Sequence, residues 1–414
     1  MIKVQNKDII WGSIIIALVL ISYLWEDVAS LLSILICLFS VVKLFETKNN
    51  VLVIIQILML TYAVIPVMYF ILGIRICHYQ AYDLNEFRNM LDVLRIQSIF
   101  LLFFLCGLDI HSNIHIVDNV NVKKNDFAYY ATFSMMLICY LMIDWRSIIS
   151  EVNKTYSIDA AGSSFFYYFS IAALVNYQFS DSKKRKFINF CLSVVLAMLS
   201  LLTGKRMATV MIGFLVYILF FSKIIGKKLT VVASFTLFLF LRLFEQIRFR
   251  KSVGLKEMIN NMFTMSGTIS NNQGDVWYAS EAINELICTK VFDLEFTIKN
   301  IIGTIINSFM PASFTPQEGI LNQYISRNRL FPYPNDGGFI SMYGYLWGRF
   351  LGVIIVAIFL SKLINNTNAK NSITSMWSIL VIVTFPRWYA YNPRILMKFL
   401  VIYLIIYFVS HIKI

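Results

Sequence analysis

The chain has 414 residues, of which 58% are hydrophobic and only 14% are charged. An ordinary globular domain is about 45–50% apolar and about 25% charged, so this composition excludes a soluble multidomain enzyme and a disordered chain. It predicts an integral membrane protein, although the formal net charge is +13. A Lys or Arg side chain costs about 2.5–3.5 kcal/mol at the centre of a spanning helix, so the positions of the cations constrain how the chain crosses a bilayer.

Twelve apolar segments approach the length of about 20 residues that a spanning helix needs. None of them alternates as a barrel strand would, so the sequence predicts an all-α polytopic membrane protein with about 12 transmembrane helices. In chain order, the segments are 9–25, 28–45, 50–74, 93–110, 127–143, 164–180, 187–203, 207–222, 229–244, 338–361, 374–391 and 395–412.

The cations of the short loops predict the orientation. With the N-terminus in the cytoplasm, the basic run SDSKKRKF (residues 180–187) falls inside, and an even number of helices places the C-terminus inside as well. Of the 16 cations on this side, 15 are lysines. They are Lys3, Lys7, Lys43, Lys48, Lys123, Lys124, Lys183, Lys184, Arg185, Lys186, Lys223, Lys227, Lys228, Lys362, Lys370 and Lys413.

The other 20 cations differ in kind, because 13 of them are arginines. Orientation requires positive charge of either type, whereas the planar guanidinium grips a phosphate or carboxylate at two points. Binding of an anionic ligand is therefore one interpretation, and interfacial snorkelling with structural ion pairs is the alternative. The arginines are Arg75, Arg88, Arg95, Arg146, Arg206, Arg242, Arg248, Arg250, Arg327, Arg329, Arg349, Arg387 and Arg394.

A long outer segment divides the predicted bundle into residues 1–244 with helices 1–9 and residues 338–414 with helices 10–12. Residues 245–337 far exceed an ordinary connection, and their composition predicts a partly helical extracytoplasmic lid. One helix is expected to be capped by Asp275. A second, amphipathic run ends at Pro311 and is expected to lie in the membrane interface or to re-enter the membrane.

Four groups of arginines are predicted to face the outer side together, which suits a polyanionic headgroup such as a pyrophosphate. Aromatic residues, among them Tyr333, accompany them and either stack on sugar rings or simply populate the membrane interface. The groups are TGKR with Arg206, RFRK with Arg248 and Arg250, SRNR with Arg327 and Arg329, and PRWYAYNPR with Arg387 and Arg394.

Three local features, together with this architecture, resemble the Wzy-type O-antigen and capsular repeat-unit polymerases, which are related to the O-antigen ligases. LLTGKRMATVMIGFLVY is similar to the family's helix–turn–helix and places Arg206 at its arginine. NDGGFISMYGYLWGRFLGVIIV is similar to the segment that closes the long loop, with Gly348 and Gly352 as its spaced glycines. Arg327 is followed by ten residues and then Gly338, as in outer loops of some members.

The resemblance implies a GT-C-like bundle in the bacterial cytoplasmic membrane. This bundle would polymerise undecaprenyl-pyrophosphate-linked oligosaccharides into O-antigen or capsule by glycosyl transfer at the outer face. No cofactor or metal is expected. The expected partners are these lipid-linked oligosaccharides and membrane lipid; a chain-length regulator is left open, and nucleic acid is not expected.

The reaction assigns roles to individual residues. The acceptor hydroxyl needs a general base, and Asp336, beside Gly337 and Gly338, is favoured over Glu318, Asp275 and Glu281; related ligases have a histidine near this place. Arg206 and Arg327 are expected to stabilise the leaving pyrophosphate. The residues expected to bind substrate are Arg248, Arg250, Arg329, Arg387, Arg394, Gly338 and Tyr333.

Two other functions fit the same sequence: a flippase or exporter of lipid-linked oligosaccharides, and an O-antigen ligase. Transporters are typified by inverted repeats, broken helices and charges at mid-membrane. The sequence has no internal repeat and its arginines gather at one predicted face, which favours catalysis there.

Overall fold

A computed structural model divides the chain into two compact units. Unit 1 comprises residues 1–113, 265–365 and 387–398, and unit 2 comprises residues 114–264, 366–386 and 399–414. The structure describes residues 6–74, 86–111, 125–143, 165–202, 206–237, 272–310, 316–319, 321–328, 330, 337–368, 372–391 and 393–411.

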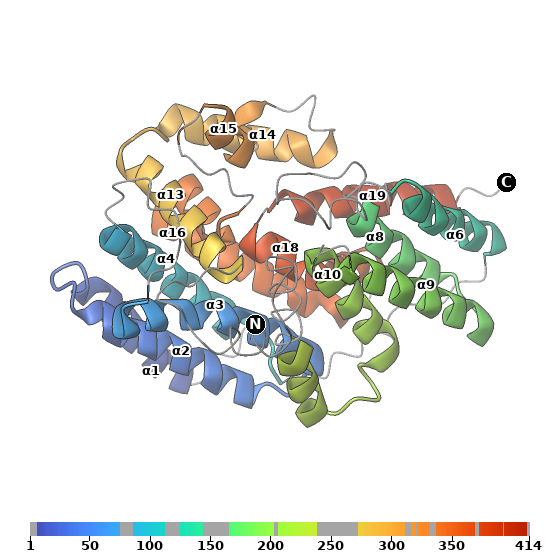
Figure 1. Ribbon diagram of the computed structural model, residues 1–414, viewed down its shortest axis with the longest axis horizontal. Coiled ribbons are helices and arrows are strands. Elements are labelled where there is room, and N and C mark those ends of the chain that lie inside the picture. Colours follow the sequence, from blue (N-terminus) through green and yellow to red (C-terminus); the bar gives the residue numbers. More distant parts are fainter. Residues whose placement is uncertain are drawn as a thin grey trace, which may run out of the picture. The chain divides into compact units, whose positions relative to one another are not determined.

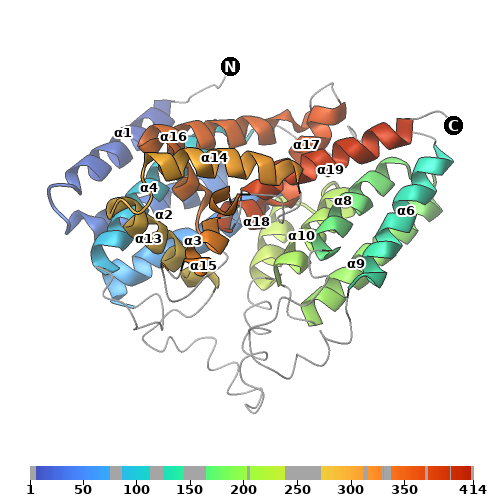
Figure 2. The ribbon, with the colours of Figure 1, turned by 90° about the horizontal axis from the view of Figure 1, so that it is seen from above.

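Every regular element within these ranges is a helix, as Figures 1 and 2 show. Unit 1 contains α1 (Asn6–Ile21), α2 (Val28–Glu46), α3 (Asn50–Leu72), α4 (Glu86–Gly107), α13 (Asn272–Cys288), α14 (Leu294–Phe309), the short helix η3 (Gln317–Gly319), α15 (Leu321–Arg327) and α16 (Ile340–Asn365).

Unit 2 contains α6 (Asp126–Leu141), α8 (Phe165–Gln178), α9 (Lys183–Leu202), α10 (Arg206–Val216), η1 (Tyr217–Phe221), η4 (Asn366–Asn368) and α17 (Ser372–Val383). Residues 227–237 are also helical. Two further helices, α18 (Phe385–Ala390) and α19 (Arg394–His411), cross the boundaries between the units.

Four of the described helices are long and apolar enough to cross a membrane: α2, α3, residues 87–107 of α4, and α16. The all-helical architecture is thus confirmed for the described residues, and its apolar helices are those of a membrane protein. The number of twelve spans stays a prediction, because the other helices are shorter or less apolar than this length and composition require.

Two predicted helices differ from the observed ones. Residues 374–391 form α17 and α18 rather than one helix, because Pro386 has no N–H to donate to the preceding turn. Within α16, Gly348 and Arg349 leave the helical conformation, with φ of −166° and 54°. The predicted continuous helix over 338–361 is therefore two helical pieces that meet at Gly348–Arg349.

Helix α13 is buried against α3, α4 and α16. Pro66 interrupts the hydrogen bonds of α3, and its missing N–H would have bonded the carbonyl of Tyr62. The indole Nε1 of Trp277 donates to that carbonyl oxygen at 3.1 Å. A group from the long segment thus satisfies the backbone acceptor that the proline leaves open.

Candidate functional site

The predicted site residues fall into three sets in the structure. Arg206 begins α10 in unit 2, although its side chain is not described. Arg327, Gly338, Arg387 and Arg394 belong to unit 1. The remaining predicted site residues lie outside the described ranges: Asp336, Arg248, Arg250, Arg329 and Tyr333.

The arginines of unit 1 differ in their surroundings. Arg327 ends α15 with an exposed side chain, whereas Arg387 and Arg394 are half-buried. The guanidinium of Arg387 lies 5.2 Å from the centre of the Tyr391 ring. The alternative bases also differ, because Glu281 is only 2% exposed on α13, while Glu318 is half-buried. Whether these residues meet one ligand stays a prediction.

Gly338 has a structural reason to be glycine that the sequence did not reveal. Its φ of 111° is unfavourable for any side chain, and an added Cβ would lie 2.7 Å from Cδ1 of Ile283. The next residue, Phe339, donates its N–H to Oγ of Ser280 at 3.0 Å. The glycine therefore allows the start of α16 to pack closely on α13, and its predicted part in binding substrate stays a prediction.

An ion pair between a buried arginine and a half-buried aspartate lies near the middle of the apolar helix α4. Arg95 is 6% exposed, and its Nη1 lies 2.5 Å from Oδ1 of Asp92. Its Nε donates to Oγ of Ser22 at 2.8 Å, and its Nη2 donates to the Ser22 carbonyl. The guanidinium also lies 3.9 Å from the centre of the Tyr23 ring. Each nitrogen of the Arg95 guanidinium thus has a hydrogen-bond partner. Arg95 forms a structural ion pair, the alternative to ligand binding that the sequence left open.

Amide side chains extend this ion pair to the end of α13. Nδ2 of Asn89 donates to Oε2 of Glu285 at 2.8 Å. Nδ2 of Asn284 donates to Oδ1 of Asn89 at 2.9 Å and approaches Oδ2 of Asp92 at 3.4 Å. Because α4 contributes Asn89 and Asp92, these bonds fix the C-terminal end of α13 against the first half of α4.

The break in α16 presents an arginine beside this network. Arg349 has φ 54° and ψ −146°, a conformation that costs a residue with a side chain about 1–3 kcal/mol. Its side chain is exposed, and the guanidinium lies 5.1 Å from the centre of the Tyr345 ring. A strained, exposed arginine in an apolar helix is a typical feature of a functional site.

Cys288 is the last residue of α13, and the charge of Arg349 at the break in α16 acts on its thiol. The Cys288 side chain is exposed, but partial loss of hydration, together with the negative charge of Asp92, raises the pKa of its thiol above the ordinary value. The positive charges of Arg88 and Arg349 act in the opposite direction. Arg88 is exposed at the start of α4. We call Arg88, Arg349, Tyr345 and Cys288 the α16-break cluster.

The sequence contains two signals for this site. Arg95 interrupts an apolar helix, and Gly348–Arg349 interrupts another. Both arginines belong to the predicted outer set, but neither belongs to the four groups. A charge within a spanning segment is itself a reason to expect function, and a glycine beside it indicates where the helix can break.

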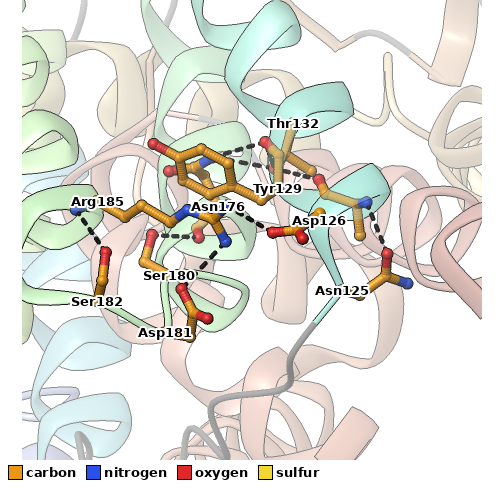
Figure 3. A network of polar contacts seen from close by, with 10 residues as sticks. Asn125, Asp126, Tyr129, Thr132, Asn176, Ser180, Asp181, Ser182 and Arg185 are labelled. Carbon is orange, nitrogen blue, oxygen red and sulfur yellow. Dashed lines mark hydrogen bonds and ion pairs between the residues drawn. The ribbon is translucent and has the colours of Figure 1, made fainter.

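A second polar network lies in unit 2, and Figure 3 shows it. Arg185 pairs with Asp126 at 2.5 Å and with Asp181 at 3.0 Å. Deeper in the unit, Nδ2 of Asn176 donates to Oγ1 of Thr132 at 3.1 Å. These bonds connect α6, α8 and the start of α9, so the predicted cytoplasmic arginine acts here as a clamp between helix ends.

Comparisons with family models, curated proteins and solved structures give no match to this chain. Within the described part of the chain, no three His, Cys, Asp or Glu side chains gather as a metal site would require. Function is therefore inferred from the arginines and from the helices that position them.

Proposed function

We propose that the protein polymerises undecaprenyl-pyrophosphate-linked oligosaccharides by glycosyl transfer at the outer face of the bacterial cytoplasmic membrane, with both termini in the cytoplasm. The observation that carries the proposal is the exposed, strained Arg349 at the break of an apolar helix. A guanidinium placed there offers a fork of donors to a pyrophosphate at membrane depth. Arg88, also exposed, adds positive charge to the same cluster.

The reaction needs a base and a charged leaving group. The acceptor hydroxyl gives its proton to a carboxylate, for which Asp336 remains our proposal, and its oxygen attacks the anomeric carbon of the donor. The bond from that carbon to the pyrophosphate oxygen breaks, and undecaprenyl pyrophosphate leaves. Arginines stabilise the charge that develops on it. Arg206 and Arg327 are proposed for this role together with Arg349.

Reconstitution tests the arginines directly. Purified protein in proteoliposomes, supplied with lipid-linked repeat units, should form a ladder of chain lengths. Arg349→Lys keeps the charge but loses the fork, so elongation should fall by about 100-fold, as for loss of one transition-state donor. Arg206→Lys and Arg327→Lys should also shorten or abolish the polymer.

Arg185→Lys is the matched control, because this arginine has its own partners in unit 2. It should leave the ladder unchanged. Normal ladders from all three variants at Arg349, Arg206 and Arg327 would refute the proposed arginine site.

An exporter of the same lipid-linked oligosaccharides is the second candidate, and the structure contains a specific reason for it. Broken helices and buried charge pairs are typical of transporters, and α16 and the pair Arg95–Asp92 have these features. A deletion strain distinguishes the two functions. Loss of a polymerase leaves single repeat units on the cell surface, whereas loss of an exporter leaves none.

A further inference from the structure

Helix α14 exposes large apolar side chains along one face, and its buried residues are small or polar apart from Phe296. The exposed side chains recur every three or four residues, so they form one stripe along the helix. Each is at least 49% exposed. We call this set the α14 stripe: Leu294, Ile298, Ile302, Ile305 and Phe309.

The opposite face of α14 is buried, and apart from Phe296 its residues are small or polar. Gly303 approaches the backbone of Gly319 so closely that an added Cβ would lie 2.6 Å from its Cα. Nδ2 of Asn300 donates to the Glu318 carbonyl at 2.5 Å. Asn307 and Ser308 lie on the buried side as well. This face therefore holds α14 to η3 and fixes the direction in which the α14 stripe points.

A further bond ties α14 to the broken helix. Nε1 of Trp347, the residue before Gly348, donates to Oδ1 of Asn300 at 2.8 Å. Beyond the break, α16 exposes Leu351, Ile355 and Phe359 at helical spacing. The α14 stripe thus belongs to a helix that contacts α16, whose own exposed face is apolar and which is long enough to cross a membrane.

We propose that the α14 stripe lies against the acyl chains of the bilayer, with α14 embedded in the outer half of the membrane. A helix that faces water buries its apolar side and exposes its polar side, whereas α14 exposes the five large apolar side chains of its stripe and buries Asn300, Asn307 and Ser308. The exposed ion pair of Lys299 with Glu295, at 2.6 Å on the flank of the stripe, places charge where it can reach the headgroups. This placement of α14 does not depend on the proposed function.

Photo-crosslinking tests this placement without altering the native cysteines. Ile302 is replaced by p-benzoylphenylalanine in the full chain, which is purified into phosphatidylcholine nanodiscs and irradiated. Because the benzophenone inserts into nearby C–H bonds, mass spectrometry should find protein carrying one phosphatidylcholine. The matched control is Lys299→p-benzoylphenylalanine, three residues earlier on the flank, where most of this adduct should be lost.

The other outcomes each contradict the proposal. Absence of a lipid adduct at position 302, in protein that elutes as the folded nanodisc complex, would place the stripe in water. A crosslinked dimer in its place would make a second copy the occupant. The same crosslinking can be carried out in cells. If position 302 then crosslinks to another protein instead of to lipid, the stripe binds a protein partner. Equal lipid adducts at 302 and 299 would remove the sidedness on which the proposal rests.

Discussion

Arg349 combines two properties that a substitution can separate, the strain of its backbone and the charge of its side chain. Glycine adopts positive φ readily, so Arg349→Gly should leave the protein as stable as the wild type or up to about 1 kcal/mol more stable. The same change removes the guanidinium and should abolish elongation. Thermal unfolding of the detergent-solubilised protein and the ladder assay measure the two effects separately. A marked loss of stability would show that Arg349 serves the fold.

The rate at which Cys288 is alkylated reports on the charges of the α16-break cluster. Partial loss of hydration and the negative charge of Asp92 raise the pKa of this thiol, so less thiolate is present at a given pH and alkylation should become fast only at higher pH than for a free cysteine. Arg349 lowers that pKa. Arg349→Gln should therefore raise it further and move the pH profile of alkylation at Cys288 to still higher pH.

Peptide mapping after timed reaction with iodoacetamide measures alkylation at this site alone. The control is Arg185→Gln, because the ion pairs of Arg185 lie within unit 2. A profile that Arg349→Gln leaves unchanged would mean that the guanidinium does not act on Cys288.

At the level of helices, the bond from Trp277 to the Tyr62 carbonyl makes a sharp prediction about α3 and α13. Trp277→Phe leaves the carbonyl without its donor and should cost about 1–3 kcal/mol. Pro66→Ala supplies a backbone N–H to the same carbonyl. In the Pro66→Ala background, Trp277→Phe should therefore cost less than in the wild type. Additive costs from unfolding measurements on the four proteins would exclude this compensation.

The helices were predictable from apolar length, because each predicted span coincides in position with helical residues in the described part of the chain. The breaks were not. The residues Pro386 and Gly348 permit an interruption, but whether a helix interrupts there depends on packing. Gly344 and Gly352 approach each other across the break in α16, a contact that the spacing of glycines alone does not specify.

The position of the site could be predicted only in part, and binding of an anion by its arginines stays a prediction. The preference for arginine over lysine left ligand binding and structural ion pairs open, and the structure separates two of these arginines by their exposure. Arg95 is engaged by Asp92 and Ser22, whereas Arg349 is exposed. Asp92 lies near Arg95 in the sequence, but Ser22 is 73 residues away. Residue type and orientation rules do not predict that second contact, so they could not distinguish these two arginines.

At the scale of the whole molecule, the distribution of charge links orientation to function. The net charge of +13 combines lysines that the predicted topology places in the cytoplasm with arginines that it places outside. Counterions screen exposed charges over about 8 Å at physiological salt. Binding of an anionic headgroup by exposed arginines should therefore weaken as salt rises, while the buried pair Arg95–Asp92 should not respond.

Thermal unfolding and binding of undecaprenyl pyrophosphate, each measured between low and high salt, should show this difference. Binding that is insensitive to salt would argue against exposed arginines as the ligands.

Polymer formation by the purified protein is the most direct test of whether the chain elongates a lipid-linked glycan. Proteoliposomes containing the wild type and undecaprenyl-pyrophosphate-linked repeat units, without nucleotide sugar, should produce a ladder of chain lengths and release undecaprenyl pyrophosphate. Arg349→Lys should remove the ladder, and Arg185→Lys should retain it. Movement of unpolymerised repeat units across the bilayer, with no ladder from the wild type, would contradict the claim and identify an exporter.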